Sequence, residues 1–89
     1  KLSKIRSQLD KLDNSLINII KKRTNLVKKV LNLKEKKNQI VDRKRIKIIL
    51  KNVRKKSLKN NIDPKITYKI WKNMISAYID FEKRNFKKK

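Results

Sequence analysis

The segment from Lys1 to Lys36 contains neither proline nor glycine and carries an apolar residue at almost every helical turn. Because an α-helix repeats every 3.6 residues, this spacing predicts one amphipathic helix roughly 50 Å long. Its apolar stripe consists of Leu2, Ile5, Leu9, Leu12, Leu16, Ile20, Val27 and Val30. Two cations, Arg23 and Lys34, fall inside the stripe rather than opposite it. Charges on an apolar face indicate either chance placement or a site for an anion.

Two shorter helices are expected after this long one. Asp42 is a suitable N-cap for a helix from about Arg43 to Leu58, since its carboxylate can accept bonds from the first backbone amides. Asp63 and Pro64 supply the N-cap and the first position of a third helix, which we expect to end at Asn85. The connections are short. The expected fold class is therefore all-α, with one long and two shorter helices.

The length of the chain limits how these helices can pack. With 89 residues, residues 1–89 form a single domain. Two helices of about half the length cannot cover the long one, and small cores without cross-links often need a partner subunit. An intertwined helical dimer, in which two long helices run antiparallel, solves this problem. We therefore expect a homodimer.

The composition excludes several kinds of chemistry. The sequence has no cysteine, histidine or glycine, so zinc sites, cysteine nucleophiles, histidine bases and phosphate-binding glycine loops cannot be built. We expect no cofactor and no metal. No run of about 18 apolar residues is present, so we expect no membrane span, and no signal peptide is visible. A cytoplasmic location is the resulting expectation.

The charge balance points to an anionic partner, but in a way that mutational bias can also explain. There are 29 Lys and Arg residues against 7 Asp and Glu, a net charge of +22. Such an excess is typical of proteins that bind nucleic acid or acidic membranes. Most of the cations are lysines accompanied by asparagine and isoleucine, the residues that AT-rich genomes over-use. Aromatic residues are not interleaved with the basic runs, so we do not expect nucleic acid as the partner.

The spacing of a few charged residues is more specific than their number. Arg23 and Lys34 are eleven residues apart, which returns to nearly the same side of a helix three turns later. Arg6 lies seventeen residues before Arg23, about 100° away around the helix, and could reach the same pocket only from a partner chain. On the third helix, Tyr78 and Glu82 share a face at i, i+4.

Each candidate also has an ordinary structural explanation. Lysine is common in the last turn of a helix, and arginine can extend from an apolar face to solvent. Asp42 can be only an N-cap, and Arg45, one turn further on, can be only solvated. Glu82 can pair at the surface with Lys83 or Lys87. None of these residues identifies a site when taken alone.

Taken together, the intervals resemble those of the all-helical class of chorismate mutase, which occurs as small dimers and as fused domains. The family opens with a segment like IRxxLDxLDxxLIxLIxxR, matched here from Ile5 to Arg23. Its lysine follows eleven residues later, at Lys34. Its next block, apolar-x-Asp-x-x-Arg-Glu, is matched from Ile40 to Arg45, and its third helix carries a glutamine, or in some members a glutamate, where Glu82 stands.

The resemblance implies a function and a role for each matched residue. The reaction would be the rearrangement of chorismate to prephenate in phenylalanine and tyrosine biosynthesis, without metal or cofactor. Arg23, Arg6 of the partner subunit and Arg45 would bind the substrate carboxylates. Lys34 and a protonated Glu82 would face the ether oxygen, and Asp42 would take the ring hydroxyl. Tyr78 stands where many members have a small hydroxyl residue.

Two departures from the family pattern leave other functions open. Ile46 replaces the usual glutamate that helps to hold the substrate hydroxyl, which predicts a weaker enzyme, and the loop before Asp42 is about one residue short. A regulatory domain that kept the fold, a pyruvate lyase acting on isochorismate, and a basic nucleic-acid-binding module remain alternatives.

Overall fold

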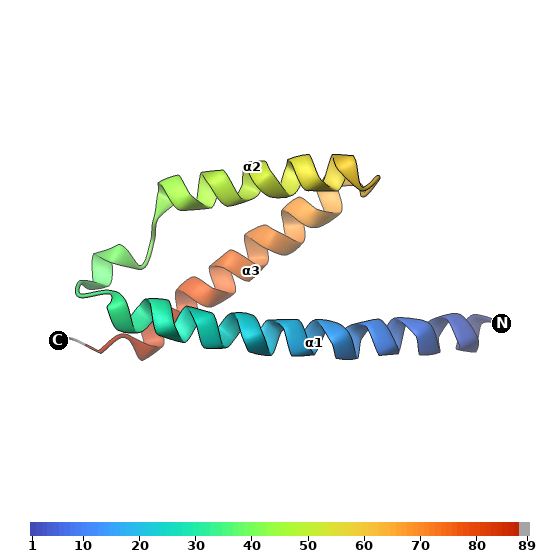
Figure 1. The fold of residues 1–89 in the computed structure, drawn as a ribbon, viewed down its shortest axis with the longest axis horizontal. Coiled ribbons are helices and arrows are strands. Elements are labelled where there is room, and N and C mark those ends of the chain that lie inside the picture. Colours follow the sequence, from blue (N-terminus) through green and yellow to red (C-terminus); the bar gives the residue numbers. More distant parts are fainter. Residues whose placement is uncertain (88–89) are drawn as a thin grey trace. The chain divides into compact units, whose positions relative to one another are not determined.

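The computed structural model describes residues 1–87 and is all-α. Its helices are α1 (Leu2–Leu33), α2 (Arg43–Lys59) and α3 (Pro64–Asn85), and a short 3-10 helix, η1 (Lys37–Gln39), precedes α2 (Figure 1). Residues 1–87 contain no strand. The expected fold class, one long and two shorter helices, is confirmed.

The chain consists of two compact units. The first is Lys1–Val30, which is nearly all of α1, and the second begins at Leu31 and contains the loop, α2 and α3. Within the described residues, no helix combines the length and the hydrophobicity that a membrane span requires.

The first unit is a single helix whose apolar residues lie at the surface. Leu9, Leu12 and Leu16 are each more than half exposed, at 54, 63 and 52 %. Exposed apolar positions alternate in spacings of three and four residues, the pattern of a coiled-coil seam. We call this set the α1 seam: Leu2, Ile5, Leu9, Leu12, Leu16, Ile19, Leu26 and Val30. Arg23 occupies the one polar position in the repeat.

The end of α1 differs from the expectation. We expected the helix to reach Lys36, but it ends at Leu33. The side-chain carbonyl of Gln39 accepts the backbone N–H groups of Glu35 and Lys36, each at 2.8 Å, and so gives the backbone an alternative to another helical turn. Lys34 therefore lies just beyond the last helical residue, Leu33.

Both helices of the second unit begin where the sequence predicts. The Asp42 carboxylate accepts the backbone N–H of Arg45 at 3.0 Å, and the Asp63 carboxylate accepts that of Lys65 at 2.9 Å. These bonds satisfy amides that have no partner within the helix. Pro64 fits the first turn of α3 because its ring fixes φ and it has no N–H to lose.

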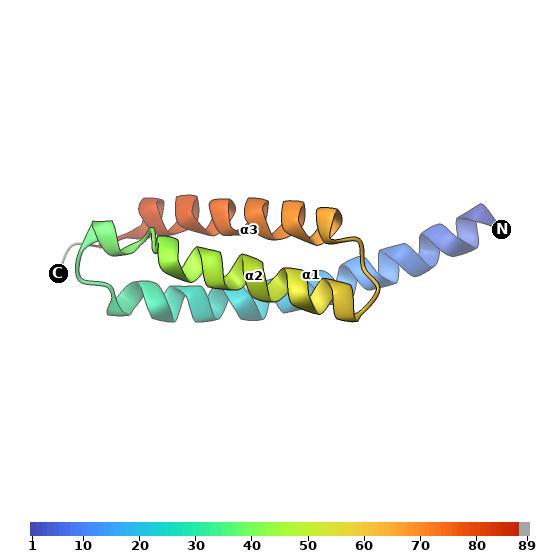
Figure 2. The same cartoon turned by 90° about the horizontal axis from the view of Figure 1, so that it is seen from above.

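The turn between α2 and α3 closes a helical hairpin. α2 ends at Lys59, one residue beyond the expected Leu58, and the Asn60 N–H bonds to the carbonyls of Lys56 and Ser57. Asn61 then takes a left-handed conformation with φ of 57°, which asparagine tolerates better than most residues. The two helices consequently lie side by side (Figures 1 and 2).

A hydroxyl pair links the two helices of the hairpin. The Ser57 and Thr67 oxygens are 2.6 Å apart, and Ser57 also donates to the carbonyl of Val53 at 2.6 Å. The buried residues among those described are Leu31, Ile40, Ser57 and Glu82. Two of the four are polar, so the core of one chain is thin.

Candidate active site

Lys34 is held by the chain reversal that follows α1. Its backbone N–H bonds to the carbonyl of Leu31 at 3.1 Å, three residues back, which tightens the last turn. Beyond it, Ile40 is only 4 % exposed and anchors the end of the loop. A buried residue on each side of the loop therefore limits where the Lys34 backbone can lie.

Glu82 meets Lys34 from the other end of the second unit. The Lys34 ammonium donates to both carboxylate oxygens of Glu82, at 3.3 and 3.2 Å. The two side chains are 19 % and 8 % exposed, so water screens the pair poorly. The attraction between the two charges is therefore stronger than it would be at the surface. The alternative in which Glu82 pairs at the surface with Lys83 or Lys87 is wrong.

Asp42 lies beside Lys34 in a shallow hollow at the start of α2. The residues that line this hollow are Lys34, Gln39, Val41, Asp42, Arg43 and Lys44. Asp42 caps α2 through one carboxylate oxygen, yet a carboxylate offers about four lone-pair sites. The same side chain can therefore hold the helix and accept a further hydroxyl.

Gln39 was not among the residues predicted for the site. It lines the hollow, and its side-chain carbonyl fixes the backbone next to Lys34. The sequence signal was weak, because a glutamine in a polar loop is usually solvated. Only its position three residues before Asp42 could have drawn attention to it.

The remaining candidates of the second unit lie on α2 and α3. Arg45 is exposed in the first turn of α2, and Ile46 follows it half-buried. Tyr78 is half-buried on α3, one turn before Glu82. The second unit thus contains Lys34, Asp42, Arg45, Tyr78 and Glu82, of which Lys34 and Glu82 are in direct contact.

The two remaining arginines belong to the first unit. Arg6 and Arg23 lie on α1 seventeen residues apart, which at 1.5 Å per residue is about 25 Å along the axis. One small ligand cannot bridge that distance. If both arginines serve a site of this kind, they serve different copies of it.

The geometry defines a class of protein before any comparison. A cation and a carboxyl group share a protected position, and among residues 1–87 no group of three or more His, Cys, Asp or Glu side chains is placed to hold a metal ion. A site of this composition can bind and orient an anion and supply hydrogen bonds, without a histidine or cysteine to act as base or nucleophile.

Comparison with known families identifies the chain. Residues 5–83 match the model of the family described as chorismate mutase type II. The chain therefore belongs to the chorismate mutase type II family, whose reaction is the isomerisation of chorismate to prephenate in aromatic amino acid biosynthesis. No curated protein and no solved structure gives a match.

Proposed function

We propose that the chain forms a homodimeric, cytoplasmic chorismate mutase, a single domain over residues 1–89, with a site centred on Lys34 and Glu82. The buried Lys34–Glu82 pair is the observation that carries this proposal, because it puts two hydrogen-bonding groups at one protected point. The substrate is a soluble dianion, which is why we favour the cytoplasm.

The reaction needs positioning and charge, and little else. In the rearrangement the ether C–O bond breaks while a new C–C bond forms, and no proton is gained or lost. An enzyme accelerates such a step by holding the flexible substrate in a compact reactive conformer. It gains further from fixed donors at the ether oxygen, where negative charge develops. We assign the ether oxygen to the Lys34 ammonium.

Glu82 must change its role when substrate binds. In the structure its carboxylate accepts both bonds from Lys34. A carboxylate cannot donate to the ether oxygen, whereas a protonated carboxyl group can donate one bond. We propose that the working form of Glu82 is protonated, which also releases Lys34 from its ion pair toward the substrate.

The other candidates bind the rest of the substrate. Guanidinium groups match carboxylates in shape and charge, so we assign the two substrate carboxylates to Arg23 and Arg6 of the partner subunit, with Arg45 assisting. Asp42 accepts the ring hydroxyl. Tyr78 lies against the ring from α3.

The homodimer is supported by the α1 seam. Its apolar side chains are exposed along the length of the helix, and only a second apolar surface removes them from water. A second copy supplies such a surface by symmetry. Antiparallel pairing of two α1 helices also brings Arg6 of the partner subunit toward Arg23, which a single helix keeps about 25 Å away.

The direct test is to follow loss of chorismate absorbance with the purified chain and to identify the product. We expect prephenate, and we expect Lys34→Ala to lower kcat by about 10²–10³, the usual effect of removing one transition-state donor. Lys37→Ala removes a nearby exposed lysine and should leave the rate unchanged. Lys34→Met with Glu82→Met replaces the pair by apolar groups and should retain the fold without activity.

Other outcomes would contradict the proposal in different ways. Release of pyruvate from isochorismate, without prephenate from chorismate, would assign the site to a lyase. A folded dimer that turns over neither compound would assign it to a regulatory domain, and Ile46 would then be the first residue to restore as glutamate.

A further inference from the structure

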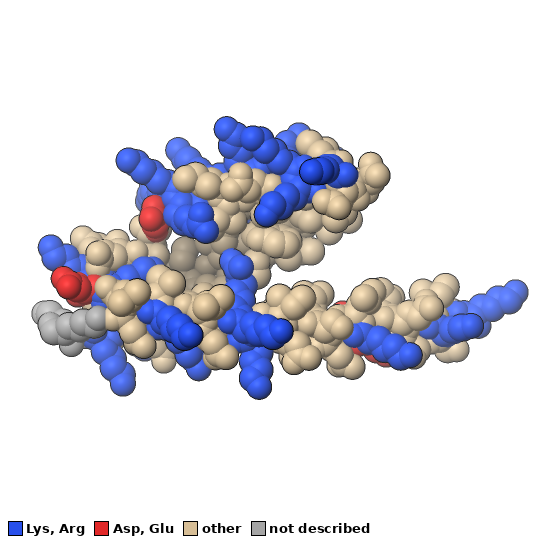
Figure 3. Space-filling model, viewed as in Figure 1, with Lys and Arg blue, Asp and Glu red and all other residues tan. Residues whose placement is uncertain are grey.

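The hairpin carries a strongly charged surface along the whole of α2. α2 contains nine cations and no acidic residue over Arg43–Lys59, and all nine are exposed. Figure 3 shows lysine and arginine side chains along α2, with other residues exposed between them. Such a density of one charge costs free energy through self-repulsion, which an anionic partner would relieve.

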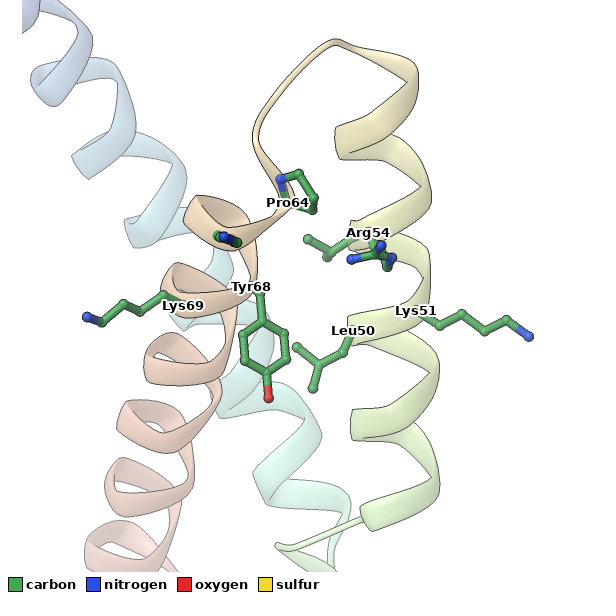
Figure 4. A pocket seen from close by; sticks show the side chains of 8 residues that line it. Leu50, Lys51, Arg54, Pro64, Tyr68 and Lys69 are labelled. Carbon is green, nitrogen blue, oxygen red and sulfur yellow. The ribbon is translucent and has the colours of Figure 1, made fainter.

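An apolar hollow of about 820 Å³ lies within this surface, between α2 and α3. Its lining includes four cations: Lys51 and Arg54 from α2, and Lys65 and Lys69 from α3. Figure 4 shows Lys51 and Lys69 extending away on its two sides. The nearest acidic residue along the chain, Asp63, is engaged by the backbone N–H of Lys65. We call these four cations and Tyr68 the hairpin patch.

Tyr68 gives the hollow an aromatic surface. Its ring stands between the two helices and points toward Leu50 (Figure 4), and the side chain is 49 % exposed. The Lys72 ammonium lies 5.4 Å from the ring centroid and donates to the phenol oxygen at 3.2 Å. The basic helix α2 contains no aromatic residue, but folding brings Tyr68 of α3 beside its cations.

We propose that the hairpin patch binds single-stranded nucleic acid, with the phosphates on the four cations and a base stacked on Tyr68. Proteins that bind single strands without sequence preference combine these two elements, a cationic track and an exposed aromatic ring. The patch is separate from the residues assigned to the mutase site. The proposal is therefore independent of the proposed enzymatic function.

A lipid surface fits these observations less well. Membrane-binding faces present apolar side chains outward, flanked by cations. On α3, the exposed aliphatic residues Ile66 and Ile70 are each two positions from Tyr68 and so lie on nearly the opposite side of the helix from it. The apolar surface in the patch is recessed in a hollow, which suits a single base better than an acyl layer.

The test is fluorescence anisotropy of a labelled oligothymidylate of about 20 nucleotides, titrated with the full chain at several salt concentrations. Replacing the four cations by glutamine should weaken binding at least about tenfold and lower the slope of log affinity against log salt by about 3. Tyr68→Leu should weaken binding about 5- to 150-fold, and Tyr68→Phe should retain it.

A matched variant separates the patch from net charge. Glutamine at Lys4, Lys11, Lys21 and Lys28 removes the same charge from exposed positions of α1 and should have a much smaller effect. Mutase activity, measured on all variants, should be unchanged. If circular dichroism shows that the quadruple patch variant does not fold, the double variant Lys51→Gln with Lys69→Gln replaces it. Its expected change in the slope of log affinity against log salt is about half as large.

Three results would overturn the proposal. If the two quadruple variants weaken oligonucleotide binding equally, the interaction depends only on net charge. Unchanged binding by Tyr68→Leu would remove the stacking contact. Binding to phosphatidylserine vesicles with the same dependence on Tyr68, and none to the oligonucleotide, would assign the patch to a lipid surface.

Discussion

The two units of this chain are stabilised in different ways. The second unit closes on itself, with two capped helices, a hydroxyl pair between α2 and α3, and a buried ion pair that joins its ends. The first unit, Lys1–Val30, is one helix with its leucines at the surface. An isolated helix gains little stability from its own backbone, because helices in proteins are held mainly by packing.

The difference indicates where a second chain is needed. Buried polar contacts fix the hairpin within one copy, whereas the α1 seam lacks an apolar counterpart of its own length among residues 1–87. In the proposed enzyme, the hairpin supplies most of the groups that act on the substrate, and the first unit joins two copies and carries Arg6 between them. The predictions below test this division, from the largest expected effect to the smallest.

Charging the α1 seam should have the largest effect. Leu9→Glu with Leu12→Glu places two carboxylates where the proposed dimer has apolar packing, and an unpaired buried charge costs about 3–5 kcal/mol. We expect sedimentation to show a monomer, and mutase activity to fall below detection because Arg6 of the partner subunit is lost from the site.

The control places the same charges on the other side of the same helix. Ser7→Glu with Asn14→Glu changes exposed polar positions of α1 and should leave both the dimer and the rate intact. Loss of the dimer in this control, or an active monomer in the seam variant, would contradict the role given to the first unit.

Mixing two inactive variants should restore part of the activity. Arg6→Ala damages each site through the partner subunit, and Arg23→Ala damages it from within. In a heterodimer of the two, one site has both arginines and the other has neither. Random exchange makes half the dimers mixed, so we expect about a quarter of the wild-type rate.

The comparison for this experiment is each variant alone. Each variant, unfolded, refolded and assayed alone, should have a much lower rate than the mixture at the same total concentration. The two variants of the mixture are unfolded and refolded together. A mixture no more active than the average of its components would show that the sites are not shared between chains.

The fold could be predicted closely from local signals. Asp42, Asp63 and Pro64 define helix starts by chemistry that acts over three residues, and all three helix starts were placed correctly to within one residue. The end of α1 was wrong because Gln39, several residues ahead, captures two backbone amides. Such a contact depends on the folded loop and leaves no periodic pattern in the sequence.

The candidate site could be predicted only in part. Family intervals selected Lys34 and Glu82, and the structure shows them in contact, although the expected end of the first helix at Lys36 was wrong. The roles of Arg6 and Arg23 stay predictions, because they depend on a second chain. The hairpin patch was not foreseen, since Tyr68 and Arg54 meet only after α2 and α3 fold together.

Two replacements of Glu82 should report which form of this side chain works. A glutamine amide donates a hydrogen bond, as the protonated carboxyl group of the proposal does, whereas alanine cannot. Glu82→Gln should therefore retain or raise kcat/KM, and Glu82→Ala should lower it by about 10²–10³. A Glu82→Gln variant as slow as Glu82→Ala would contradict the assigned role.

The smallest expected effect is a difference in the free energy of unfolding between two serine-to-alanine variants. Ser57 is 3 % exposed in the second unit, where its hydroxyl bonds to Val53 and Thr67, so Ser57→Ala should lower the free energy of unfolding by about 0.5–1.5 kcal/mol. Ser15, on the exposed surface of α1, also donates to a carbonyl four residues back, at 3.4 Å. Since alanine favours helix and water can replace this bond, Ser15→Ala should be neutral or slightly stabilising.

The coupling between Ser57 and Thr67 tests the reason for that difference. In urea denaturation, the double variant Ser57→Ala with Thr67→Val should lose less stability than the sum of the two single variants, because each single change leaves the other hydroxyl without its partner. Additive effects would mean that the hydroxyl pair does not join α2 to α3. A loss at Ser15 equal to that at Ser57 would mean that the first unit is stabilised by its own polar contacts, and the reason for assigning it to a dimer interface would weaken with it.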